Sequence, residues 1–198
     1  MRHILALVLL LGLSSLAAAQ DESYGVGVGP QAGVPVQSGD FSNYVDWGRG
    51  IHAHFRYLPN ESIAIHGHTG YLSWQGNTEV PLYAGSDTST TQDYDTIPLM
   101  IGVQQTIKTF DWVKVYVTGE VGFRFYNINQ RNLNADGSIA WQESLSETKL
   151  SFAPGIGVTW RLGDYSYADA ALRYEHVSGG LSYVSLTLSV GYRPYPEY

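Results

Sequence analysis

Apolar side chains alternate with glycine or polar side chains along most of the chain. Between residues 50 and 57, for example, isoleucine, alanine, phenylalanine and tyrosine alternate with histidine and arginine. A period of two is typical of a β-strand whose two faces meet different environments. The pattern recurs in eight segments, at residues 24–37, 50–57, 63–71, 97–107, 113–125, 149–161, 168–175 and 184–193. The sequence therefore predicts antiparallel strands of about 10–14 residues, a length that crosses a bilayer when the strand is tilted.

The connections between these segments fall into short and long classes. Tight turns are predicted at residues 59–61, 109–111 and 163–164. Longer polar loops are predicted at residues 37–44, 75–93 and 127–147, and the last connection, 178–180, is short. Short turns at one end and long loops at the other are typical of outer-membrane barrels, with the turns in the periplasm and the loops outside. Both termini are then expected on the periplasmic side.

The composition of the two strand faces distinguishes a membrane barrel from a soluble one. One face carries valine, isoleucine, leucine and phenylalanine, whereas the other carries glycine together with arginine, lysine, glutamate and histidine. Glycine suits the crowded interior of a small barrel, and an apolar outer face suits lipid. The pattern predicts an all-β, eight-stranded, antiparallel up-and-down transmembrane β-barrel with its apolar face outward and a polar lumen. The alternative is a soluble barrel of lipocalin type, with its apolar face inward.

Aromatic residues near the strand ends support the membrane interpretation. Tyrosine and tryptophan gather at the two interfaces of a bilayer. One rim is predicted to hold Tyr24, Tyr57, Trp112 and Tyr192. The other rim is predicted to hold Trp47, Tyr71, Trp74 and Tyr126.

The first residues have the plan of a secretory signal peptide. A basic start at residues 1–3 precedes an apolar run at residues 4–13 and three small residues, Ala17 to Ala19. Cleavage after Ala19 is expected to leave residues 20–198 as the barrel domain, exported to a bacterial outer membrane. Across the 198 residues there is no cysteine, which excludes disulfides and thiolate sites, and the net charge of −7 argues against nucleic-acid binding.

The polar face concentrates charged residues in the predicted lumen. The predicted network comprises Arg56, Lys114, Glu120, Arg124, Lys149, Arg161, Asp169, Arg173, Glu175 and Arg193. Bases outnumber acids in this set. Because an eight-stranded barrel is only wide enough for side chains to fill it, these charges predict a salt-bridged plug rather than a pore. A narrow, porin-like channel is the alternative.

Four histidines, His52, His54, His66 and His68, also face the predicted lumen. A three-residue turn at residues 59–61 would pair His54 with His66 and His52 with His68. Opposed imidazoles at this spacing could share a metal ion, although no cysteine or carboxylate accompanies them in the sequence. A polar lumen filled with hydrogen-bonded side chains is the simpler interpretation, and a response to pH is a third. No cofactor is predicted.

Several short motifs resemble the small eight-stranded barrels of the outer membrane protein beta-barrel domain family. The resemblance covers the mature chain and is carried by residues 57–60 (YLPN), 97–99 (IPL), 115–122 (VYVTGEVG), 154–158 (PGIGV) and the last strand, Tyr183 to Tyr192. It implies the barrel fold but not one activity, because members serve as adhesins, envelope spacers, small channels or enzymes. One departure is that residues 193–198, with two prolines, follow Tyr192, where such barrels usually end on an aromatic residue.

His176 and Ser178 raise an enzymatic alternative. They resemble the His-x-Ser motif of the outer-membrane lipid A deacylases, in which the two residues act as base and nucleophile beside an acidic residue on the next strand. Here the last strand has no acidic residue before Glu197, and Gly179 stands where that family usually has asparagine. The incomplete motif makes these two residues weak catalytic candidates only.

The sequence therefore predicts a non-enzymatic outer-membrane protein with a structural or surface-interaction role through its extracellular loops. The expected partners are outer-membrane lipids, lipopolysaccharide and the outer-membrane assembly machinery, and the expected state is a monomer.

Overall fold

A computed structural model describes residues 23–36, 45–59, 62–76, 80–81, 89–134, 138–179 and 181–194. The predicted signal peptide lies outside the described residues. The described strands are β1 (Ser23–Pro35), β2 (Val45–Leu58), β3 (Ile63–Gly76), β4 (Val80–Pro81), β5 (Ser89–Thr109), β6 (Val113–Leu133), β7 (Ile139–Arg161), β8 (Ser166–Val177) and β9 (Leu181–Tyr192). No helix among these residues has the length and apolar character needed to cross a membrane.

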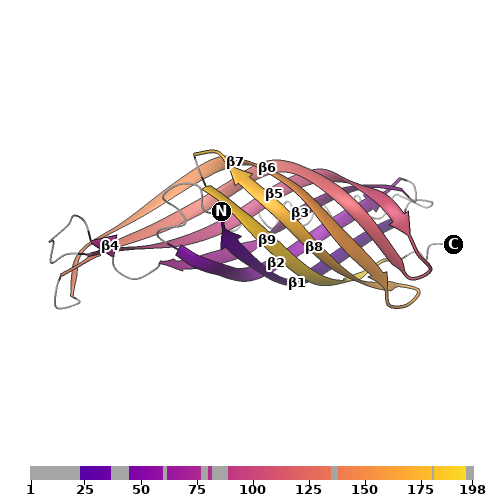
Figure 1. Cartoon of the computed structure of the whole chain (residues 1–198), viewed down its shortest axis with the longest axis horizontal. Coiled ribbons are helices and arrows are strands. Elements are labelled where there is room, and N and C mark those ends of the chain that lie inside the picture. The colour runs from indigo at the N-terminus through magenta and orange to yellow at the C-terminus, as the bar shows by residue number, and fades with distance from the viewer. Residues whose placement is uncertain are drawn as a thin grey trace.

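The long strands form a closed antiparallel ring (Figure 1). Strands that are neighbours in the chain pair with each other, and the two-residue β4 pairs only with the outer part of β5. β3 pairs with β5, as in Ile65↔Val103, and the first strand β1 pairs with the last strand β9, as in Val28↔Val190, so the eight long strands form one closed ring. The predicted eight-stranded up-and-down barrel is confirmed.

The two faces of each strand lie as predicted. Along β2, for example, Ile51 is 62% exposed on the outer face, whereas the neighbouring His52 is 2% exposed inside. The outer face of the ring is consequently a continuous apolar surface of valine, isoleucine, leucine and phenylalanine. Such a surface belongs in lipid rather than in water.

The predicted long loop at residues 127–147 is largely strand, and the described part of the predicted loop at residues 75–93 belongs to β3, β4 and β5. The rest of that loop and the predicted loop at residues 37–44 lie outside the described residues. β5, β6 and β7 contain 21, 21 and 23 residues, so they run far beyond the rest of the barrel and project from one end of it in Figure 1. The prediction of a loop at residues 127–147 was wrong because the alternating apolar pattern stops at Phe125 and Leu150, whereas backbone pairing continues to Leu133↔Ile139. Strand pairing needs backbone hydrogen bonds and not apolar side chains.

We call the projecting part of these three strands, residues 89–95, 127–133 and 139–148, the arm, and the barrel end that carries it the arm end. The opposite end, here the turn end, carries the short connections between β2 and β3, β5 and β6, and β7 and β8. The first residue of β1 pairs with Leu58 at the turn end, and β9 also finishes there.

Two of the residues predicted for the aromatic rim lie inside the barrel instead. Trp74 is 0% exposed and Tyr126 is 2% exposed. Both carry the parity of the lumen-facing residues on their strands, since Trp74 follows His66 and His68 by even steps and Tyr126 follows Arg124. By contrast, Trp47, Tyr71, Trp112 and Tyr192 are exposed on the outer surface.

Candidate functional site

Three buried ion pairs cross the lumen. Arg56 pairs with Asp169, Arg173 with Glu120, and Arg124 with Glu175, each at 2.6 Å between nitrogen and oxygen. The members of each pair come from strands that are not neighbours in the ring, β2 and β8 for one pair and β6 and β8 for the other two, so the contacts tie these strands together. Each of the three carboxylates has one arginine, and this layer of the lumen is therefore electrically balanced.

Neutral side chains complete the bonding of the buried carboxylates. Asp169 accepts hydrogen bonds from the hydroxyl groups of Tyr116 (3.0 Å) and Thr159 (2.7 Å). Glu175 accepts one from Ser185 at 3.0 Å. A buried ion pair is stable only when such partners satisfy the remaining oxygen lone pairs. The lumen is thus a connected plug of polar side chains.

The register between β2 and β3 differs from the prediction by two residues. The structure pairs Arg56 with His66 and His54 with His68, whereas His52 pairs with Gly70. The predicted facing of His54 with His66 and of His52 with His68 was wrong. The physical reason is the position of the turn, because pairs such as Tyr57↔Ile65 are centred one residue further along the chain than a turn at residues 59–61 would place them. A shift by two keeps the parity, so all four histidines still point into the lumen.

The four imidazoles bind protein groups rather than converge on one point. His66 Nε2 and His68 Nδ1 lie 2.9 and 2.5 Å from the two oxygens of Glu120. His54 Nε2 lies 2.8 Å from the hydroxyl of Tyr167. Among the described residues, no group of three or more histidine, aspartate or glutamate side chains is arranged to hold a metal ion. The geometry gives the alternative of a shared metal ion no support.

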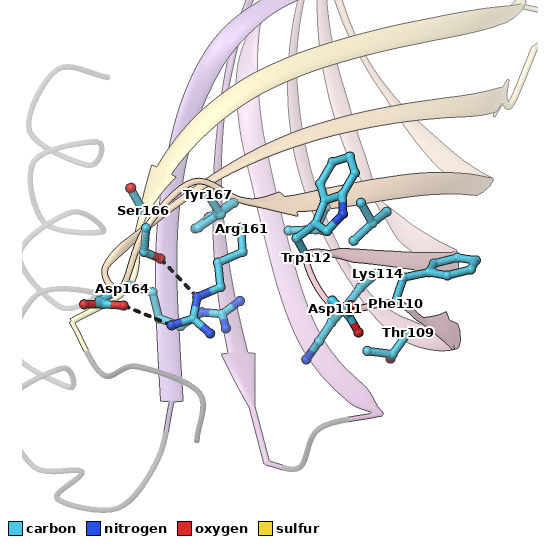
Figure 2. A pocket seen from close by; sticks show the side chains of 13 residues that line it. Thr109, Phe110, Asp111, Trp112, Lys114, Arg161, Asp164, Ser166 and Tyr167 are labelled. Carbon is cyan, nitrogen blue, oxygen red and sulfur yellow. Dashed lines mark hydrogen bonds and ion pairs between the residues drawn. The ribbon is translucent and has the colours of Figure 1, made fainter.

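The remaining predicted lumen charges lie at the two ends of the barrel. Lys149 pairs with Glu147 at the arm end, with 2.8 Å between nitrogen and oxygen. Arg161 is exposed at the turn end, where it pairs with Asp164 at 3.0 Å. Lys114 and Arg193 line a cavity at that same end together with Arg161 (Figure 2). The basic surplus that the sequence predicts for the lumen is therefore concentrated at one mouth.

An aromatic cluster fills the lumen toward the arm end. Its members are Val45, Leu72, Trp74, Tyr94, Tyr126, Val177, Leu181 and Tyr183, with Ile128 packed against it. Trp74 meets Tyr183 edge to face, with 4.9 Å between ring centroids. The sequence-based reasoning missed this cluster, although strict parity along β3 and β6 would have placed Trp74 and Tyr126 inside.

Apolar side chains change faces where the barrel becomes the arm. Phe123 and Phe125 point outward, whereas Tyr126 and Ile128, further along the same strand, carry the inward parity. Ile128 pairs across β6–β7 with Leu145. Trp141 shares the parity of Leu145, and these two are 46% and 45% exposed. The arm therefore presents apolar side chains on its inner face, continuous with the aromatic cluster below.

One edge of the arm has an open backbone. Within the described residues, the pairing of β7 with β8 begins at Ser151, and Ser178 donates its N–H to the carbonyl of Leu150 at 2.9 Å. Backbone groups alternate between the two sides of a strand. Those of Gln142, Ser144, Ser146 and Thr148 consequently point to the side where β8 has already ended.

His176 and Ser178 do not form a catalytic pair in the structure. The Nδ1 atom of His176 lies 3.2 Å from the hydroxyl oxygen of Ser182, its neighbour across β8–β9. No carboxylate among the described residues contacts this histidine. The arrangement lacks the acidic group that would orient the imidazole for nucleophilic catalysis.

Comparison with known proteins agrees with this architecture. A family model described as outer membrane protein beta-barrel domain matches residues 5–193. None of the curated proteins matches the chain in sequence. Several solved structures of outer-membrane proteins share the fold. OprG from Pseudomonas aeruginosa is 12% identical with a TM-score of 0.57, over 87% of this chain and 96% of that chain.

Two further solved structures are similar to the chain. Ail from Yersinia pestis, in complex with the heparin analogue sucrose octasulfate, is 17% identical with a TM-score of 0.52, over 87% of this chain and 97% of that chain. A major outer membrane protein from Thermus thermophilus is 14% identical with a TM-score of 0.53, over 86% of this chain and 99% of that chain. At these identities the likeness concerns the fold alone.

Proposed function

Because the chain belongs to the outer membrane protein beta-barrel domain family, we propose that it acts at the bacterial surface as a closed barrel whose arm binds a protein partner. The observation that carries the proposal is the arm itself. It continues the strand pairing of the barrel from Asn127↔Ser146 to Leu133↔Ile139, beyond the last lipid-facing side chains. The proposal refines the expected surface-interaction role by replacing the predicted loops with an ordered sheet.

The open edge of β7 supports a polypeptide as the partner. An edge strand presents a row of backbone N–H and C=O groups, and an extended chain can add to it as a further strand. The alternating groups of Gln142, Ser144, Ser146 and Thr148 match such a chain. Lipids and small molecules do not present a row of hydrogen-bond donors and acceptors that repeats every two residues, as an extended chain does.

The inner face of the arm supports the same partner. Trp141 and Leu145 together form an apolar strip above the aromatic cluster, in a position that lipid does not reach if the arm stands outside the membrane. An added strand could place alternate apolar side chains against this strip. Main-chain bonds would then supply affinity, and the strip would supply specificity.

The remaining assignments belong to the same proposal. The arm end faces the exterior and the turn end faces the periplasm, because outer-membrane barrels carry their short turns on the periplasmic side. The protein acts without catalysis, as a monomer surrounded by outer-membrane lipids and lipopolysaccharide. The filled lumen supports a closed barrel in preference to the porin-like alternative.

The test uses a shortened arm. Replacing residues 127–146 by Asn-Gly joins Tyr126 to Glu147, which already pair, through a two-residue hairpin turn and removes most of the open edge and the apolar strip. Wild-type protein in nanodiscs is used to select extended twelve-residue peptides from a displayed library, with counter-selection on the shortened protein. We expect selected peptides to bind wild type and to lose at least tenfold in affinity for the shortened variant.

Two substitutions at one position distinguish strand addition from other modes of binding. Ser144→Pro removes one N–H from the open edge without touching the β6 ladder, and Ser144→Ala retains that N–H. Peptide affinity should fall in the proline variant and stay unchanged in the alanine variant. Both should keep the heat-modifiable gel mobility of a folded barrel. Equal binding to all variants, or no enrichment of peptides, would refute the proposal.

A further inference from the structure

We propose that the cavity at the turn end binds the phosphodiester headgroup of a phospholipid. The cavity has a volume of about 220 Å³ and opens at the mouth of the barrel, between the β5–β6 and β7–β8 turns (Figure 2). This volume is below the roughly 300–1,000 Å³ of pockets that hold drug-sized ligands, so it suits a small headgroup. The proposal is independent of the arm and its partner.

The charge distribution of the molecule points to an anion at this mouth. The whole chain carries a net charge of −7, and the three lumen carboxylates are each paired with one arginine. The cavity lining nevertheless holds three cationic side chains, Lys114, Arg161 and Arg193, and two acidic ones, Asp111 and Asp164. The mouth is therefore locally basic on an acidic protein.

The cationic groups come from separate elements and meet at one opening. Lys114 lies near the start of β6, Arg161 ends β7, and Arg193 follows the end of β9. The guanidinium carbon of Arg193 lies 5.8 Å from the centre of the Tyr167 ring, a residue that also lines the cavity. Two guanidinium groups and an ammonium group are the donors that proteins use for phosphate oxygens.

The rim of the cavity identifies the anion as part of a lipid. Phe110 and Trp112, both in the lining, are 47% and 63% exposed, and the nearby Leu162 is 60% exposed. Exposed tryptophan beside cationic groups is typical of the headgroup level of a membrane. A phospholipid could place its phosphate in the cationic mouth while its acyl chains follow the apolar outer wall of the barrel.

The test measures binding in a detergent that carries neither charge nor phosphate. Protein refolded in dodecyl maltoside is titrated with dihexanoyl phosphatidylglycerol and followed by isothermal titration calorimetry. We expect saturable binding by the wild type and at least tenfold weaker binding by the Lys114→Gln, Arg161→Gln, Arg193→Gln triple variant. The matched control is Lys149→Gln, which removes one cation at the opposite end and should leave the affinity unchanged.

Each alternative outcome has a defined meaning. Equal affinity in the wild type and the triple variant, or an equal loss in Lys149→Gln, would overturn the site. Inorganic phosphate that binds as tightly as the lipid, or a muropeptide that binds where the lipid does not, would overturn the lipid assignment. If the triple variant lacks heat-modifiable mobility, Arg161→Gln alone is used, because its side chain is half-exposed, and unchanged affinity there would also refute the proposal.

Discussion

Gly119 and Gly122 lie three residues apart in β6 and face opposite sides of the barrel wall. A methyl group built on Gly122 would lie 2.1 Å from the carbonyl oxygen of Leu99, which is backbone of the neighbouring strand. One built on Gly119 would meet nothing within 4 Å. The first glycine is therefore required by the close approach of two strands, whereas the second faces open, lipid-side space.

We expect Gly122→Ala to destabilise the barrel strongly, by several kcal/mol, because backbone atoms must move to admit the methyl group. Gly119→Ala should be neutral or slightly stabilising, since alanine loses less backbone entropy on folding than glycine. Urea unfolding in lipid vesicles measures both. Equal losses in the two variants would contradict the close-approach explanation.

Glu175 is held by Arg124 and Ser185 in the fully buried part of the lumen. Glu175→Gln removes the charge and leaves Arg124 buried without its counter-ion, which should cost roughly 3–5 kcal/mol of unfolding free energy. Asp164→Asn breaks the exposed pair with Arg161 at the turn end and should cost about 0–1 kcal/mol. The same unfolding measurement compares the two.

A double variant tests whether the charge is the cause. Arg124→Met added to Glu175→Gln removes both members of the pair and should recover part of the loss, giving a clear coupling energy in a double-mutant cycle. Additive losses would mean that Arg124 and Glu175 act separately and that the pair is not the unit of stability.

At the scale of elements, the parity of side chains was predictable and the exact register was not. The alternation along β2 and β3 places every histidine in the lumen, and the structure agrees. The choice between His54↔His66 and His54↔His68 depends on whether the pairing is centred on the predicted turn or one residue further along the chain. Both registers bury the same face of the strand, so the hydrophobic pattern cannot distinguish two registers that differ by two residues.

The arm illustrates a different limit of sequence reasoning. Residues 127–133 and 139–147 are mostly polar, and polar composition resembles that of a loop. What makes them strands is cooperative pairing with the barrel strands that they extend, which is a property of the hairpin and not of either sequence alone. The inward Ile128, Leu145 and Trp141 were the available signal, since their shared face differs from the lipid face.

Hydrogen exchange should reveal the open edge of β7 residue by residue. We expect the amides of Ser144 and Ser146 to exchange quickly, because they point away from β6 into solvent, and those of Glu143 and Leu145 to be protected by the β6–β7 ladder. NMR of the refolded barrel resolves these amides individually. Equal protection along the strand would mean that the edge is covered, and the proposed docking mode would then fail.

At the scale of the whole molecule, the barrel is divided along its axis into layers with different tasks. The basic mouth lies at the turn end, the three balanced ion pairs lie in the middle, and the aromatic cluster closes the lumen below the arm. The sequence supplied the inventory of these layers through parity. It did not supply their order along the axis or the pairing of Glu120 with His66 and His68, because those contacts join strands that are distant in the chain.

This layering predicts that the barrel conducts no ions. An ion crossing the lumen would have to pass Trp74 and Tyr183, which are both 0% exposed, and then the buried pair of Arg124 and Glu175. Separating Arg124 from Glu175 leaves an uncompensated buried charge, so thermal opening of an ion path through the lumen is expected to be rare. Planar-bilayer recordings should therefore stay at background for wild-type protein, while a general porin inserted under the same conditions shows clear steps. Stable unitary steps from the wild type would contradict the closed plug and return the porin-like channel as the better explanation of the lumen charges.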